Sequence, residues 1–81
     1  MEIPLSEVPL GWPAVVRRVD ALPWVTQRLG ELGLLEGTRV IPLFQSGSHD
    51  PTAYHFRQTV IALRGDMARQ IVVTLENPDI P

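Results

Sequence analysis

The sequence predicts a mainly β fold: a small closed barrel of about five short strands, with one short α-helix and one helical turn. Three observations lead to this prediction. The chain has 81 residues, enough for a single domain over residues 1–81 with one modest core. Eight prolines in so short a chain disfavour long helices and favour short strands joined by tight turns. Finally, Gly33 and Gly37 stand where a helix must end and a β-prone segment begins.

The composition is that of an ordinary globular protein, and it excludes several chemistries. There is no cysteine, and therefore no disulfide, no thiolate nucleophile and no sulfur metal site. All seven basic residues are arginines, so Schiff-base chemistry by lysine is excluded. The net charge of −2 argues against nucleic-acid binding, and no glycine-rich phosphate loop is present. No apolar stretch approaches the ~20 residues of a membrane span, and the start lacks a secretory signal, so we expect a cytoplasmic protein without direct membrane insertion.

The N-terminal part is expected to be extended and then to enter a strand. Residues 1–13 contain three prolines, which prevent a regular helix. Ala14 to Val19 is β-prone, with Ala14 and Val16 on one face. Because Val19 departs from that alternation, a bulge or the strand end is predicted near Arg18.

A short α-helix is predicted at about 23–32. Pro23 suits the first helical position, where its missing N–H costs nothing. Apolar residues recur at i, i+4 and i+7 and are expected to face the core: Val25, Leu29 and Leu32. On the other side, Trp24 and Arg28 are four residues apart and could stack. Gly30 within so short a helix indicates close approach of another backbone.

The end of this helix is followed by a tight turn. Gly33 is expected to adopt a positive φ just after the last helical residue, with Leu29 and Leu34 supplying the apolar contact of such a cap. The segment 35–38 is typical of a type II turn, because Gly37 stands at its third position.

The remaining strands are predicted from short β-prone runs: Thr38 to Phe44, Tyr54 to Arg57, Thr59 to Arg64 and Ile71 to Leu75. Proline has no N–H to donate and belongs on an edge strand or at a bulge, so we expect this strand to be edge-like at Pro42. Residues 45–51 have strong turn chemistry and are predicted to form a loop. A helical turn is expected at about 66–70, capped by Asp66. The tail 76–81 is expected to be flexible.

Polar side chains of catalytic or metal-binding type gather around the predicted loop. Ser46, Ser48, His49 and Asp50 are the residue types of a hydrolase triad, but neighbours on one loop do not converge as a triad must, so a solvated turn is favoured. His49, Asp50 and His55 could in principle bind a divalent metal, which needs roughly three or four converging ligands. The sequence shows no such convergence. We therefore assign no catalytic residue, no cofactor and no metal ligand.

Four ordered blocks of the sequence resemble the FeoA family, the small proteins of the bacterial ferrous iron uptake system. The blocks are Arg28-Leu29-x-Glu31-Leu32-Gly33-Leu34-x-x-Gly37, Asp50-Pro51, Ile61-Ala62-Leu63-Arg64 and Ala68-x-x-Ile71-x-Val73. The resemblance covers residues 4 to 75 and implies an SH3-like barrel in the cytoplasm. It also implies a partner, the membrane transporter FeoB with its cytoplasmic G-protein domain. The chain departs from the family pattern at Glu36, Pro42 and Gln58, where a proline, a β-branched residue and a glycine are common.

The same module resembles the C-terminal SH3-like domain of iron-dependent transcriptional repressors. Because the chain begins at Met1 with no helix-turn-helix ahead of that module, a stand-alone protein is expected.

The expected function is therefore that of a non-enzymatic accessory protein that docks on FeoB and modulates ferrous iron uptake. The alternative is a metal-binding sensor or iron-delivery protein that uses His49, Asp50 and His55. Trp12, Ile41 and Leu43 are among the apolar residues that the predicted core leaves unassigned, and a contiguous exposed patch would mark a partner site. The residues predicted to bind the partner are Trp24, Arg28, Leu34 and Leu35, with Gly33 and Gly37 as structural turns. Weak self-association is left open.

Overall fold

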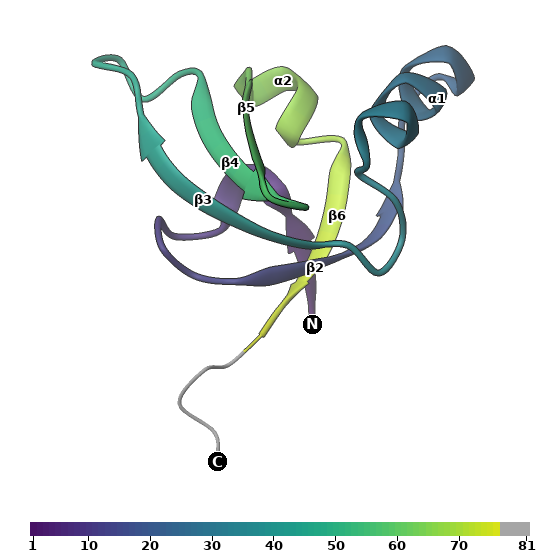
Figure 1. The fold of residues 1–81 in the computed structure, drawn as a ribbon, viewed down its shortest axis with the longest axis horizontal. Coiled ribbons are helices and arrows are strands. Elements are labelled where there is room, and N and C mark those ends of the chain that lie inside the picture. The colour runs from purple at the N-terminus through teal and green to yellow at the C-terminus, as the bar shows by residue number, and fades with distance from the viewer. Residues whose placement is uncertain (77–81) are drawn as a thin grey trace.

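A bent antiparallel sheet of six strands forms the framework, in the order β1-β6-β2-β3-β4-β5 (Figure 1). The computed structural model describes residues 1–76. The strands are β1 (Glu2–Pro4), β2 (Ala14–Val19), β3 (Arg39–Gln45), β4 (Thr52–Phe56), β5 (Thr59–Leu63) and β6 (Ile71–Leu75). The helical elements are the 3-10 turn η1 (Leu5–Glu7), the helix α1 (Pro23–Leu32) and the short helix α2 (Gly65–Ala68).

The mainly β class with about five short strands is confirmed, with one strand more than the five counted, but the predicted closure of the barrel is wrong. The segment Glu2–Pro4 is a sixth strand, which pairs with β6 through Ile3 and Val73 among others. Pro4 is compatible with this strand because β1 is the edge of the sheet, where a missing N–H leaves no partner unsatisfied. The sheet is open, since β1 and β5 form its two ends and do not pair with each other.

The core lies inside the bend of the sheet and is filled by alternating strand residues. Fully buried side chains come from every part of the chain: Leu5, Val16, Leu34, Val40, Phe56, Ile71 and Val73. The bulge predicted near Arg18 is confirmed, because the pairing of β2 with β6 shifts register between Val16 and Arg18. This shift lets β2 continue along β6 to Val19.

Pro42 lies in a strand that is inside the sheet, but β3 is edge-like at this residue, as predicted, and a bulge follows it. The register of β3 with β4 shifts between Pro42 and Phe44. On the other side β2 pairs only with Arg39 and Val40, so no partner needs an N–H from Pro42. The Pro42 carbonyl accepts the Gly11 N–H at 2.7 Å. The bulge leaves Phe44 exposed, although strict alternation would place it on the face of buried Val40.

The predicted helix and its glycine cap are confirmed in detail. α1 spans Pro23–Leu32 as predicted. Gly33 has a φ of 106°, its N–H donates to the Gly30 carbonyl at 3.0 Å, and the Leu34 N–H donates to the Leu29 carbonyl at 2.9 Å. These two bonds define a Schellman motif, and the side chains of Leu29 and Leu34 are both buried beside it.

The turn that follows is also as predicted. Gly37 has a φ of 89°, and the Thr38 N–H donates to the Leu35 carbonyl at 3.0 Å. The Thr38 hydroxyl donates to the Gly33 carbonyl at 2.9 Å, which ties the turn back to the helix end.

Helix α2 is capped differently from the prediction. It spans Gly65–Ala68, and the Gly65 N–H donates to Oδ1 of Asp50 at 2.8 Å. The carboxylate of Asp66, the predicted cap, accepts instead from the N–H of Met67 next to it. The guanidinium of Arg64, the residue before the helix, lies 3.8 Å from Oδ2 of Asp50. A residue distant in sequence therefore holds both the start of α2 and the arginine before it.

The predicted flexible tail begins at Glu76, but Glu76 itself is held in place. Its N–H donates to the Pro13 carbonyl at 3.0 Å, and its carboxylate pairs with Arg39. Residues 77–81 lie outside the described residues.

Candidate interaction surface

Helix α1 stands at one end of the molecule, beside the bent sheet, and most of its surface is free (Figure 1). Only Val25 and Leu29 among its ten residues are buried. The helix begins at Pro23, where the Leu22 carbonyl accepts the N–H groups of Val25 and Thr26 at 2.9 and 3.0 Å. Two apolar side chains and the Schellman turn thus hold α1, while its other flanks face solvent.

One exposed flank carries a line of three side chains, which we call the α1 stripe: Trp24, Arg28 and Leu32. They are spaced at i, i+4 and i+8, so they follow one another along the helix. Trp24 is 69% exposed and Leu32 is 39% exposed. The guanidinium of Arg28 lies 3.9 Å from the carboxylate of Glu31, and both are exposed, so this pair leaves Arg28 available.

The prediction that Leu32 faces the core is wrong. The chain reverses direction at Gly33, and the side chain of Leu34 fills the part of the core next to the last helical turn. Leu32 therefore remains outside. In the sequence, the spacing of four residues between Arg28 and Leu32 indicates that Leu32 lies in the stripe.

The other two predicted partner-binding residues do not extend the α1 stripe. Leu34 is only 1% exposed, so a partner cannot contact it in this structure. Leu35 is exposed, and its Cδ2 lies 3.1 Å from the position that a Cβ on Gly30 would take. The helical period puts Gly30 on the flank away from the stripe. Gly30 therefore makes room for a side chain, and not for the backbone that we expected.

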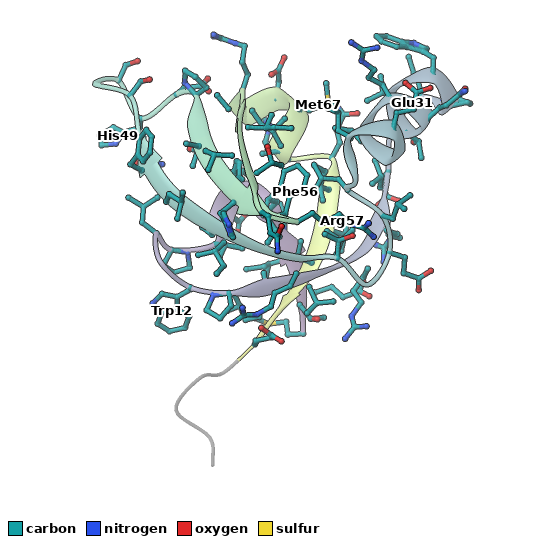
Figure 2. All side chains as sticks on the ribbon, in the orientation of Figure 1. Trp12, Glu31, His49, Phe56, Arg57 and Met67 are labelled. Atoms are coloured by element: carbon teal, nitrogen blue, oxygen red, sulfur yellow. The ribbon has the colours of Figure 1, made fainter. Side chains whose placement is uncertain are left out.

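A second group of exposed apolar side chains, the loop cluster, lies away from α1: Leu10, Trp12 and Leu43. The hydrogen bond from Gly11 to Pro42 joins the two segments that carry them. Trp12 is 48% exposed and lies on the far side of the sheet from α1 (Figure 2). The loop cluster is therefore a surface separate from the α1 stripe.

The three residues proposed as metal ligands do not come together. His49 lies in the loop between β3 and β4 (Figure 2), with its Nδ1 3.1 Å from Oε1 of Gln45. Asp50 is bonded to Gly65, and His55 is half-buried within β4. Among residues 1–76, no group of three or more histidine, aspartate or glutamate side chains is placed to hold a metal ion.

The serines of the same loop make hydrogen bonds within the loop itself. The Ser48 hydroxyl donates to the Asp50 carbonyl at 3.3 Å, and the Ser46 N–H donates to the Pro51 carbonyl at 3.1 Å. The part of the chain that the structure describes encloses no pocket. A surface that binds another macromolecule is the kind of site that this geometry fits best.

Comparisons with known proteins give the family. The sequence model of the FeoA domain matches residues 3–75. The chain belongs to the FeoA family. This family is associated with ferrous iron transport, and its members are small accessory domains rather than known enzymes. The family resemblance predicted from the four sequence blocks is therefore confirmed.

Solved FeoA structures have the same fold. The FeoA protein of Chlorobium tepidum is 31% identical with a TM-score of 0.88, over 96% of this chain and 74% of that one. The FeoA of Stenotrophomonas maltophilia, solved with zinc, is 33% identical with a TM-score of 0.78 over 88% of each chain. It is described as a prokaryotic SH3 domain protein, so the SH3-like prediction is supported.

A FeoA-like protein of Clostridium acetobutylicum shares the fold at 22% identity, with a TM-score of 0.87 over 99% of this chain and 93% of that one. No curated protein sequence matched the chain. Within residues 1–76, no helix of this FeoA-family chain has the length and apolar character to cross a membrane.

Proposed function

We propose that this chain is a cytoplasmic accessory protein of ferrous iron uptake that docks on a FeoB-type transporter and modulates its activity. The observation that carries the proposal is the α1 stripe, an exposed line of one tryptophan, one arginine and one leucine on a helix that only two buried side chains attach. Family membership supplies the process, ferrous iron transport. The docking would bring the chain to the inner face of the membrane through its partner.

The chemistry of the α1 stripe suits such a contact. Tryptophan and arginine are the residue types that most often dominate binding energy at protein interfaces. Covering Trp24 with a partner would contribute up to roughly 1.5–3 kcal/mol, and Leu32, which is only 39% exposed, would contribute less. Modulation further requires that the chain bind two states of the transporter with different affinity, because a ligand with equal affinity for both shifts neither.

Co-purification with the full-length transporter tests the proposal, with the transporter held in its GDP state and in its GTP-analogue state. We expect association in at least one state, and we expect Trp24→Ala to weaken it by about tenfold or more. Trp12→Ala is the matched control, since it removes the same side chain from the loop cluster. Equal binding by both variants would contradict docking through α1, and loss only in Trp12→Ala would move the contact to the loop cluster. No association in either nucleotide state would contradict the proposed function itself.

A metal-binding sensor or iron-delivery protein is the second candidate, because the Stenotrophomonas maltophilia relative was solved with zinc. It has less support here, since His49, Asp50 and His55 lie in different surroundings. Calorimetry with ferrous or zinc ion on the wild type and on a His49→Ala/His55→Ala variant separates the two candidates. Submicromolar binding that the variant loses would favour the second candidate over the first.

A further inference from the structure

The two ends of the open sheet differ in how they are protected from pairing. β1 has three residues and carries a carboxylate and a proline, Glu2 and Pro4. β5, at the other end, has five residues and neither a charge nor a proline: Thr59, Val60, Ile61, Ala62 and Leu63. Charged residues, prolines and short length are the means by which proteins keep exposed strand edges from pairing. β5 has none of them.

The hairpin geometry shows which backbone groups of β5 are free. A two-residue turn, Arg57 and Gln58, joins β4 to β5, and both of its residues have positive φ. In such a hairpin the residues that flank the turn exchange hydrogen bonds, so residues 59, 61 and 63 bond to β4. Val60 and Ala62 therefore direct their N–H and C=O groups away from the sheet. No turn, loop or side-chain hydrogen bond within residues 1–76 reaches either residue, and Val60 is 50% exposed.

The outer face of the sheet beside this edge is apolar. The strand registers place two rows of side chains across β3, β4 and β5: Ile41–His55–Val60 and Phe44–Ala53–Ala62. Neither row contains an acidic residue or an arginine. Because both rows run to the free edge, a further strand would continue them without bringing charges together.

We propose that β5 pairs with β5 of a second copy of this chain, antiparallel and with the two-fold axis at Ile61. In this register Val60 of each copy stands opposite Ala62 of the other, and each pair exchanges two N–H···O=C bonds. The two Ile61 side chains face each other in a close pair of β-branched residues, and the outer rows of the two copies become continuous. The result is a twelve-stranded sheet, from six strands in each copy, joined at its two uncharged edges.

The same register leaves the ends of the paired strands balanced in charge. Arg57 of each copy stands opposite Gly65 of the other, at the start of α2. The carboxylates near Gly65 belong to Asp50 and Asp66, and Arg64 and Arg69 lie beside them. Arg64 of each copy stands opposite uncharged Gln58. The strand edge thus fits its own copy in backbone hydrogen bonding and in apolar side chains.

Sedimentation equilibrium at up to about 1 mM protein tests the pairing, a concentration at which weak association becomes measurable. We expect the wild type to dimerise, and we expect Ala62→Pro and Ala62→Lys to weaken dimerisation by about tenfold or more. Ala62→Pro removes an N–H that points outward, so the hairpin keeps its own bonds. Ser46→Lys adds the same charge on an exposed loop and should leave the dimer unchanged. Amide exchange adds a local readout: the Val60 and Ala62 amides should slow as the concentration rises.

Circular dichroism at low concentration establishes that each variant is folded, and the lysine variant keeps the test valid if the proline variant is not. A wild type that stays monomeric at about 1 mM would overturn the proposal. So would a dimer that both Ala62 variants retain, or protection that appears elsewhere than at Val60 and Ala62. A monomer whose Val60 amide slows only with the transporter present would assign the edge to a partner's strand. Docking through the α1 stripe is independent of all these outcomes.

Discussion

The Cδ of Arg57 lies 2.9 Å from the position that a Cβ would occupy on Gly33. Arg57 belongs to the turn between β4 and β5, and Gly33 ends α1, so the contact joins the helix to the far hairpin (Figure 2). Cε2 of Phe56 lies 3.6 Å from the same position. Gly33 is therefore required twice, for its φ of 106° and for the space beside it.

Replacing Gly33 should cost more stability than replacing Gly37. Both glycines have positive φ, but nothing lies within 4 Å of a Cβ at Gly37. We expect Gly37→Ala to lower the free energy of unfolding by about 1–2 kcal/mol, and Gly33→Ala by about 2–4 kcal/mol because the Arg57 contact must also move. Gly33→Val should cost at least as much as Gly33→Ala. Urea unfolding measures all three, and equal losses at the two positions would show that the Arg57 contact costs nothing.

Gln58→Gly should stabilise the domain. Gln58 has a φ of 64°, in a region that glycine adopts without steric cost. We expect a gain of about 0.5–1 kcal/mol in the free energy of unfolding. Gln58→Ala keeps the Cβ and serves as the control that should bring no gain. A lower melting temperature for Gln58→Gly than for Gln58→Ala would contradict this account of the turn.

Asp50→Ala should loosen the start of α2. It removes the acceptor for the Gly65 N–H and the carboxylate near Arg64, so we expect a loss of about 1–2 kcal/mol. Asp50→Asn keeps an acceptor oxygen and should lose less. Amide exchange at Gly65, together with thermal unfolding, checks both variants. If the alanine and asparagine variants were equally stable, the hydrogen bond to Gly65 would not be the stabilising contact.

Stability should fall above about pH 10 because of Tyr54. Burial raises the pKa of Tyr54 above its ordinary value of 10.0. The unfolded chain then loses the phenol proton first, so the contribution of Tyr54 is complete below about pH 10 and is lost as the pH rises through the folded pKa. The slope cannot exceed about 1.4 kcal/mol per pH unit, the limit for one proton.

The composition excludes interference from other side chains in this measurement. The chain has one tyrosine, no cysteine and only arginines as basic side chains, so Tyr54 is the only side chain that titrates near pH 10. Urea unfolding of the wild type and of Tyr54→Phe between about pH 9 and 12 should show the slope in the wild type alone. The same slope in Tyr54→Phe would assign it to another group.

The features that the sequence predicted correctly are those that depend on local backbone demands. Pro23 begins the helix and Gly33 ends it, because each suits one backbone conformation irrespective of the rest of the chain. The strand β1 was missed because its three residues are defined only by pairing with β6, at the far end of the sequence. The cap on α2 was missed for the same reason, since Asp50 is 15 residues from Gly65.

The candidate surfaces could be predicted only in part. Residue type alone indicated Trp24 and Arg28, but placing Leu32 outside and Leu34 inside requires the path of the chain after the helix. The free edge of β5 follows from the strand order, which no local pattern defines. Strict alternation would place Phe44 in the core beside Val40, but a bulge after Pro42 reverses the alternation and leaves Phe44 exposed.

The attachment of α1 has a consequence for how the molecule opens. Val25 and Leu29 are the only buried side chains of α1, and the turn at Gly33 with its Arg57 contact completes the attachment of the helix. With so few contacts, we expect α1 to open at a lower free energy than global unfolding, while the strands remain paired. A partner bound to α1 would then displace the helix relative to the sheet without disturbing the strand pairing.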